Sequence, residues 1–273
     1  MAIITISREL AALGDETAHE LAKLLDYRFV DKNTLEERIK ACGVAGRKLE
    51  RYDERKPSFW ASLSQDRDDY LHYLKTVILN EAMEGNCVFI GRGAGVIFKN
   101  VPGVLSVFLV APYDIRIERV RSYFHCDEKK ARQIIEQSDR DRVGFHRYFF
   151  DIDWKDPGNY QLTLNTGHLH PAVCAESIKH IRDCFCSPES EPLHVKRLKE
   201  LILGQRVKHH ILYEKGTAVH FLEVSVSDNT VTLYGVANSQ ALVEVAVSAA
   251  KDMISPQSVR SEIQVVQEYS IMP

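Results

Sequence analysis

Arginines recur in three short segments of this 273-residue chain, and their side chains suit the binding of phosphate groups. The segments are ISRE, with Arg8, then GRGAG, with Arg92, and DRDRVGFHR, with Arg140, Arg142 and Arg147. A guanidinium carries a permanent charge and a planar fork of N–H donors that matches phosphate oxygens. Cations of this kind are also needed around a phosphoryl group while it is transferred. Side chains of this type could therefore contact phosphate groups.

Each of these arginines also has a structural interpretation. Arg92 follows an apolar strand pattern, and an ion pair with a neighbouring acid is the alternative explanation for a charge at that place. The arginines of DRDRVGFHR alternate with Asp139 and Asp141, which are intrahelical partners on a solvated helix face in this interpretation.

A turn between a strand pattern and a helix pattern follows Arg8. Ile3–Ile6 is a short β-branched run, and apolar residues recur at helical spacing after Gly14. In a phosphate-binding loop, backbone N–H groups and a helix N-terminus surround the phosphates, glycines let the backbone come close, and a lysine offsets charge. Here the loop has no GxxxxGK[ST] and no lysine, and Gly14 is its one glycine. On periodicity alone, this stretch is only a strand-to-helix turn.

Strand and helix patterns alternate along the first two thirds of the chain. NCVFIG and SVFLVAP are almost continuously apolar, which is typical of parallel strands covered on both faces. YRFV and YQLTLNT are shorter strand patterns, and the helix after YRFV is expected to start near Asn33 or Thr34, either of which could cap it. This order predicts an α/β fold with a doubly wound parallel sheet. Further helices are expected at 65–84, 113–124, 127–150 and 171–185.

A polar stretch, SPESEP at 187–192, has two prolines and no apolar periodicity, so it is interpreted as a linker between domains 1–186 and 193–273. The second domain has the pattern αββαβ. Its helices are expected at 193–203 and 240–254, with strands in HFLEVSVSD, NTVTLYGVANS and EIQVVQEY.

The composition is that of an ordinary globular protein, with 45% hydrophobic and 27% charged residues. A net charge of -3 gives no global reason to expect nucleic acid as a partner. The chain shows neither a signal-peptide pattern nor an apolar run long enough to cross a membrane, so it is expected in the cytoplasm with its six cysteines reduced.

Several segments, in order, resemble the cytidylate-kinase-like family of P-loop nucleoside monophosphate kinases over residues 2–184. The family opens with a pattern like ISRxxGSGGxxIAxxLAxxLG, to which ISRELAALGDETAHELAKLLD corresponds. YRFVDK, GRGAG, VFLVAP with IRIERV, DRDRVGFHRYFFDIDW and YQLTLNT follow in the same order.

The resemblance implies ATP as phosphoryl donor, Mg²⁺, and CMP, dCMP or a related nucleotide as acceptor. Arg92 is expected to contact the acceptor monophosphate, and DRDRVGFHR matches the segment that forms a lid over the phosphates. The implied site residues are Arg140, Arg142 and Arg147 for catalysis, Ser7, Arg8, Gly14 and Asp15 for the donor phosphates, and Asp31, Gly91, Arg92 and Gly93 for the acceptor.

This chain departs from the family in the loop itself. GSGG is replaced by AALG, and Asp15 stands where a basic residue is often found. Side chains at Ala11, Ala12 and Leu13 restrict the φ > 0 conformations that a phosphate nest uses, and a carboxylate repels a triphosphate unless a metal bridges them. The alternative function is therefore a catalytically degenerate nucleotide sensor or scaffold that signals through the C-terminal domain.

The C-terminal segment from about 193 to 268 resembles a BON domain, most specifically in VTLYGVANSQALVEVAVSAA. The resemblance implies a small-molecule, membrane or protein ligand, or a role in folding or dimerisation alone. A separate group of histidines and cysteines has no standard metal-ligand spacing, and no bound metal is expected there. The group is His168, His170, Cys174, His180, Cys184 and Cys186.

Overall fold

The computed structural model describes residues 1–42, 64–186, 191–254 and 258–266. The chain divides into two compact units, Met1–Val195 and Lys196–Pro273. Of the expected linker, residues 187–190 lie outside the described residues, and Glu191 begins a helix.

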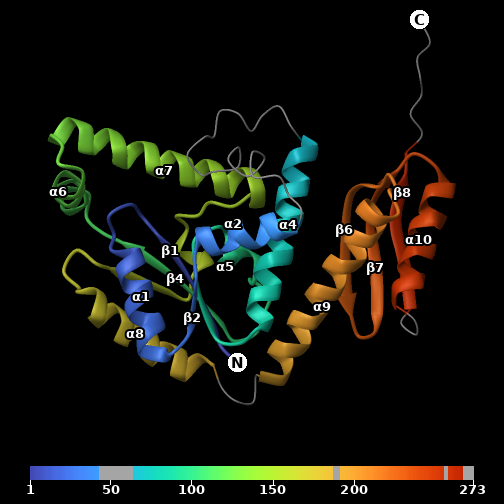
Figure 1. Ribbon diagram of the computed structural model, residues 1–273, viewed down its shortest axis with the longest axis horizontal. Helices are drawn as coiled ribbons and strands as arrows, with labels where there is room; N and C mark the ends of the chain where they lie inside the picture. The colour runs from blue at the N-terminus through green and yellow to red at the C-terminus, as the bar shows by residue number, and fades with distance from the viewer. Residues whose placement is uncertain (43–63, 187–190, 255–257, 267–273) are drawn as a thin grey trace, which may run out of the picture. The chain divides into compact units, whose positions relative to one another are not determined.

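The first unit is built on a five-stranded sheet in the order β2-β3-β1-β4-β5, in which every pairing is parallel (Figure 1). The fold class expected from the alternating patterns is confirmed. Parallel pairing places the carboxyl ends of the strands at one edge of the sheet, where such folds bind ligands. The strands are β1 (Ile3–Arg8), β2 (Arg28–Val30), β3 (Cys87–Ile90), β4 (Val104–Val110) and β5 (Leu162–Asn165).

One face of this sheet is covered by α1 (Gly14–Leu25) and α8 (Pro171–Phe185), which pack against each other (Figure 1). Alternate residues of the central strands, among them Ile4 and Val107, form a core with Leu21 and Ile178. The other alternate residues of these strands are buried on the second face of the sheet. The strands are almost continuously apolar because both of their faces are covered.

The second face has an aromatic core. Phe89 of β3 packs on Phe98, and Phe108 of β4 lies between the rings of Trp154 and Tyr160. Trp154 is fully buried. The elements on this side are α2 (Lys32–Ala41), α4 (Ser64–Met83), α5 (Ala94–Ile97), α6 (Tyr113–Phe124), α7 (Glu128–Phe150) and the 3-10 turn η3 (Pro157–Asn159).

The start of α2 differs from the sequence prediction. Asp31 is its N-cap, because the carboxylate accepts hydrogen bonds from both the backbone N–H and the hydroxyl of Thr34, each at 2.8 Å. An aspartate serves this role well because its oxygen satisfies an N–H that lacks a partner in the first turn.

The second unit has a three-stranded sheet in the order β6-β7-β8, in which β6 and β7 are antiparallel and β7 and β8 parallel. Helix α9 extends further than the predicted 193–203, since it ends at His209 and is followed directly by a π-helical turn, His210–Glu214. The hydrophobic core of the second unit includes Val207, Leu233 and Ala246. The elements are α9 (Glu191–His209), β6 (His220–Ser227), β7 (Thr230–Ala237), α10 (Gln240–Ile254) and β8 (Ser258–Val265).

Two further properties concern the whole described chain. None of the helices among the described residues is both long and apolar enough to cross a membrane. All six cysteines are free thiols.

Candidate phosphate site

The loop between β1 and α1 adopts left-handed backbone conformations without the expected glycines. Ala11 has φ 61° and Leu13 has φ 50°. A residue with a Cβ atom is strained in this region, at about 1–2 kcal/mol each. The three side chains were expected to restrict such conformations, yet two of the three residues adopt them. Something outside the loop must therefore stabilise it.

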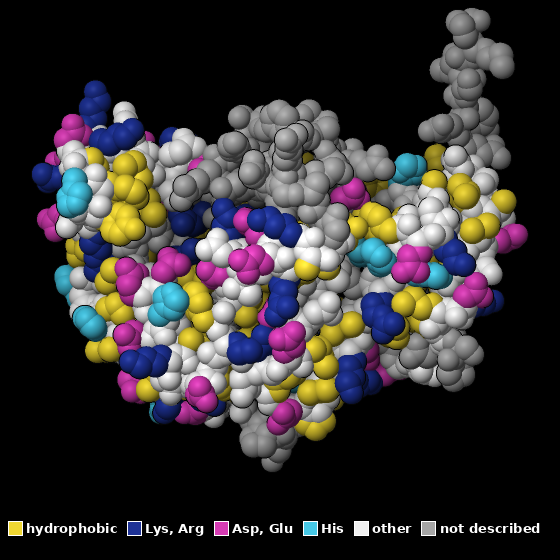
Figure 2. Space-filling view, in the orientation of Figure 1, with side chains coloured by type: hydrophobic (Ala, Val, Ile, Leu, Met, Phe, Trp, Pro, Cys, Tyr) yellow, Lys and Arg dark blue, Asp and Glu magenta, His cyan; other side chains and the backbone are white. Residues whose placement is uncertain are grey.

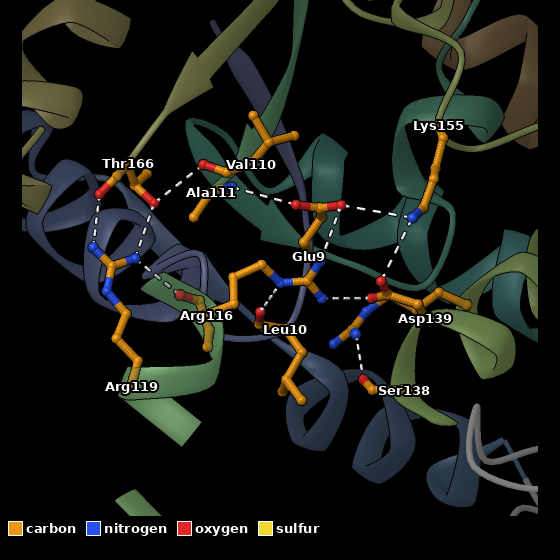
Figure 3. A network of polar contacts seen from close by, with 12 residues as sticks. Glu9, Leu10, Val110, Ala111, Arg116, Arg119, Ser138, Asp139, Lys155 and Thr166 are labelled. Carbon is orange, nitrogen blue, oxygen red and sulfur yellow. Dashed lines mark hydrogen bonds and ion pairs between the residues drawn. The ribbon is translucent and has the colours of Figure 1, made fainter. Parts of the chain in front are cut away.

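Side chains from distant segments fix the loop by binding its carbonyl groups (Figure 3). Two arginines of α6 and the residue after β5 donate these hydrogen bonds, together with the first turn of α1. The contacts are Arg116 Nε to Leu10 O at 2.8 Å, Arg119 Nη1 to Ala11 O at 2.9 Å, Thr166 Oγ1 to Ala12 O at 3.0 Å, and Thr17 N and Oγ1 to Leu13 O at 3.0 and 2.7 Å.

The amide groups of the loop are oriented differently from its carbonyls. Within the described residues, no protein acceptor bonds the N–H of Leu10, Ala11 or Leu13, nor those of residues 14–16. The last of these begin α1, where the first N–H groups of a helix have no intrahelical partner and the helix dipole is positive. Successive amides at a helix N-terminus form an anion-binding site.

Arg8 lies across this helix start. A Cβ atom added to Gly14 would lie 2.3 Å from Cγ of Arg8, so the arginine stem covers the glycine directly. Its Nη2 atom is 3.5 Å from Oδ1 of Asp15, whose side chain is largely exposed. The guanidinium thus lies at a loop that has no lysine of its own, and it is paired with Asp15.

The loop forms one wall of a cleft of about 780 Å³. Three arginines contribute to its lining, namely Arg8, Arg119 and Arg142. Burial lowers the pKa of Arg119, opposed by the carboxylate of Glu16, but an arginine stays charged at any physiological pH. The other lining residues are Glu9, Leu10, Ala11, Leu13, Gly14, Asp15, Glu16, Val120, Ser122, Tyr123 and Phe124.

An ion-pair network around the buried Arg116 connects the loop to α7 (Figure 3). Arg116, which is 3% exposed, donates from Nη2 to Asp139 at 2.8 Å and lies 3.2 Å from Glu9. Lys155 lies 3.6 Å from Glu9 and 3.5 Å from Asp139, so each acid faces two cations. The other oxygen of Glu9 accepts the N–H of Ala111 after β4. The network therefore fixes the base of the loop relative to α6 and α7.

The expected acceptor residues lie at the ends of the neighbouring strands. Gly91, Arg92 and Gly93 follow β3 with three successive left-handed conformations, at φ 73°, 54° and 69°. Gly91 N donates to the carbonyl of Ile6, so this turn is directly beside the end of β1, after which the loop begins. A strained arginine between two glycines at a strand end is typical of a functional turn.

Arg92 itself is 2% exposed and paired with Glu36 of α2 at 2.8 Å. Its guanidinium also lies over the ring of Phe145, 5.7 Å from the centroid. The structure therefore contains the ion pair of the alternative explanation for Arg92. The carboxylate of Asp31 accepts hydrogen bonds as the N-cap of α2.

The three arginines expected in a lid, Arg140, Arg142 and Arg147, lie on α7 and differ in exposure. Arg142 is half-buried and lines the cleft. Arg140 is exposed and bonds Gln137 at 3.0 Å on its own helix, and Arg147 is exposed as well. Ser7 lines a separate cavity of about 170 Å³, together with His146 and Tyr160. The structure thus groups Arg8, Gly14, Asp15 and Arg142 in the cleft.

Sequence reasoning assigned no role to Glu9, Arg116, Arg119 or Thr166. The IRIERV segment was part of the family resemblance, and its two arginines at i and i+3 were the available signal, because such a pair shares one helix face. Nothing in the local pattern indicates that this face contacts the loop.

Two members of the histidine and cysteine group have other contacts. His170 caps α8 by accepting the N–H of Ala172 at 3.3 Å, and Cys186 donates to the carbonyl of Gly103 at 3.1 Å. Cys174 is buried. Within the described residues, no set of three or more His, Cys, Asp or Glu side chains is arranged to hold a metal ion.

This chain has the architecture of a kinase-like α/β protein. Its parallel sheet is open, a loop lined with amides follows the first strand, and arginines line the same cleft as that loop. Residues 3–168 match the cytidylate kinase-like family, and this chain belongs to that family. Residues 200–267 match the BON domain.

A cytidylate kinase from Sulfolobus acidocaldarius is 34% identical over 96 residues, which are 35% of this chain and 52% of the relative. The chain thus spans about half the length of that curated relative. A crystal structure of an uncharacterized protein from Eubacterium ventriosum has a TM-score of 0.53 and 22% identity, over 67% of this chain and 99% of that chain. It shares the fold. A shikimate kinase from Bacteroides thetaiotaomicron has a TM-score of 0.39 and 18% identity, over 67% and 97% of the two chains.

Proposed function

We propose that the first unit binds ATP with the triphosphate on the loop between β1 and α1, and transfers the γ-phosphoryl group to a nucleoside monophosphate, with CMP and dCMP as the preferred acceptors. The observation that carries this proposal is the orientation of the loop. Its carbonyls are bound by Arg116, Arg119 and Thr166, while the amides of Leu10, Ala11, Leu13 and residues 14–16 have no acceptor among the described residues. A loop held in this way can bind phosphates although Gly14 is its one glycine.

The arginines of the cleft supply the positive charge that the loop lysine would otherwise provide. Arg8 is at the helix start, Arg119 is behind the loop and Arg142 extends from α7. Positioning and electrostatic stabilisation account for nearly all of the catalysis of phosphoryl transfer, so no covalent intermediate with the protein is required. Arg142 is the described lid arginine best placed to stabilise the transferred group.

Mg²⁺ fits this site through carboxylates that the cleft presents. This ion commonly uses one or two protein carboxylates together with substrate phosphates and water. Asp15 and Glu16 both line the cleft and are exposed, so they would hold the ion. When bound, Mg²⁺ neutralises phosphate charge, which turns the acid at position 15 from a source of repulsion into a ligand.

On the acceptor side, Arg92 is proposed to exchange its partner. Its ion pair with Glu36 holds the guanidinium at the end of β3, next to the donor loop. An incoming monophosphate would compete with the carboxylate of Glu36, and the left-handed turn on either side of Arg92 keeps its backbone in place. Asp31 would act through α2, which it caps and which carries Glu36.

The test is ADP formation from ATP and Mg²⁺ by the full chain, with CMP, dCMP, UMP and AMP as acceptors. Arg142→Ala should lower the acceptor-dependent rate by about 10³-fold, as for a cation on the transferred group. Arg140→Ala is the matched control on the same helix, because this exposed arginine lies outside the lining of the cleft, and it should keep the wild-type rate. Equal rates in the two variants would contradict the assignment of Arg142.

A second candidate function is nucleotide sensing without transfer, with the BON domain as the output module. Asp15 favours it, because the acid neutralises Arg8 in the absence of a metal. ATP binding without turnover for any acceptor would support this candidate over the kinase.

A further inference from the structure

Two adjacent aromatic side chains are exposed at the end of α6. Tyr123 is 79% exposed and Phe124 is 49% exposed. Their ring centroids are 4.9 Å apart with an interplanar angle of 75°, so the two rings form an edge-to-face pair. Hydrophobic side chains are visible on the surface over α6 and the adjoining end of α7 (Figure 2). Exposing two large rings side by side costs hydrophobic free energy, and such patches commonly mark ligand sites.

The pair lies in the cleft that the phosphate loop borders. Tyr123 and Phe124 line it at the end of α6, and Arg119 lines it one helical turn earlier. Arg119 is also the residue that binds the carbonyl of Ala11 in the loop. Four residues of α-helix rise about 6 Å, so α6 leads from the loop past a cation to an aromatic surface.

The chemistry of the cleft changes along this direction. The amides and the acids of the cleft belong to the loop and the start of α1. On α6 beyond Arg119, the described lining consists of Val120, Ser122, Tyr123 and Phe124. This part offers hydroxyl groups and ring faces, but no amide or carboxylate side chain that would read the edge of a base.

We propose that Tyr123 and Phe124 are the platform on which the base of the donor nucleotide stacks, and that they hold the base with little regard to its identity. The inference rests on the proposed function, because it takes the loop to be the triphosphate site. Stacking tolerates different bases because every base has a π face, whereas selection needs hydrogen bonds to its edge. ATP and GTP should therefore be bound with similar affinity.

The experiment is calorimetric titration of the full chain, with Mg²⁺ present, by ATP, GTP and inorganic tripolyphosphate. Tripolyphosphate has the phosphate chain of the donor but neither its ribose nor its base. Tyr123→Ala should weaken ATP and GTP binding by about tenfold, equivalent to about 1.4 kcal/mol, and leave tripolyphosphate binding unchanged. Phe124→Ala should act in the same direction, and Tyr123→Phe, which keeps the ring, should bind as the wild type does.

Tyr113→Ala is the matched control, because Tyr113 is an exposed tyrosine of α6 outside the lining of the cleft and should have no effect on any of the three ligands. Unchanged ATP affinity in Tyr123→Ala would overturn the platform while leaving the loop site intact. An equal loss for tripolyphosphate would also overturn it, since the rings would then act on the loop. If the wild type bound neither ATP nor tripolyphosphate, the proposed function itself would fail.

Discussion

Replacing Arg116 with methionine tests whether the phosphate loop is held by the network at its base. Methionine keeps much of the length of the arginine stem and removes the guanidinium. The side chain is 4% exposed and interacts with Leu10 O, Glu9 and Asp139. The substitution therefore leaves two acids without their main cation, at side-chain exposures of 13% and 18%.

The magnitude follows from this geometry. Removing one partner of a buried ion pair costs about 3–5 kcal/mol, because the remaining charge stays buried. Lys155, at 3.6 Å from Glu9 and 3.5 Å from Asp139, offsets part of this loss. We expect the free energy of unfolding of the first unit to fall by about 3 kcal/mol.

Urea unfolding followed by tryptophan fluorescence would measure this loss. Both tryptophans of the chain precede residue 196, so their signal reports the first unit. Arg132→Met is the matched control on α7, because Arg132 pairs with Glu128 at 2.7 Å on the surface. Surface ion pairs contribute little, so this variant should unfold almost as the wild type does.

A second effect should accompany the loss of stability. Without Arg116, the carbonyl of Leu10 loses its donor and the loop gains freedom, so tripolyphosphate should bind more weakly to the folded variant. A destabilisation of less than about 1 kcal/mol, with unchanged tripolyphosphate affinity, would refute the claim that the network fixes the loop.

Two further predictions concern the backbone and a buried thiol. Ala11→Gly should raise the free energy of unfolding by about 0.5–1 kcal/mol, because glycine relieves the strain at φ 61°. Ala12→Gly should lower the free energy of unfolding by about 1 kcal/mol, because Ala12 is buried and lies outside the left-handed region. Urea unfolding of both variants measures the two changes, and equal effects would contradict the strain at Ala11. Burial raises the pKa of the Cys87 thiol to about 12, so the folded chain holds this proton more tightly than the unfolded chain, and the stability that follows is lost as pH rises from the ordinary thiol pKa of about 8.5 towards 12. The fall in the free energy of unfolding between about pH 8 and pH 10 should therefore be smaller in Cys87→Ala than in the wild type, and an equal fall would refute the buried-thiol contribution.

The sheet could be predicted from sequence because its signal is local. Continuous apolar runs such as CVFI and VLSVFLV have one explanation in a chain of alternating elements, which is a strand buried on both faces. The first and last residues of the helices and strands were harder to predict from sequence. The cap of α2 is Asp31 rather than Asn33 or Thr34, since all three residues are good caps and the backbone geometry chooses between them.

The conformation of the loop could not be predicted because its cause is not local. Arg119 is 108 residues from Ala11, and Thr166 is 154 residues from Ala12, yet each binds the carbonyl of its partner. Only the tertiary structure brings them together. The sequence shows that two glycines of the family pattern are lost, whereas the structure shows which donors hold the loop without them.

The contact between Arg8 and Gly14 has an evolutionary consequence. Because a Cβ atom at position 14 would overlap the arginine stem at 2.3 Å, each residue limits what the other can become. Shortening the side chain at position 8 would remove the cation at the start of α1, and it would still leave the Cβ atom of residue 8 at 2.6 Å from a Cβ atom at position 14. The residues at positions 8 and 14 are therefore expected to change together in evolution. Packing against Arg8 constrains Gly14 to be glycine as much as the binding of a ligand would.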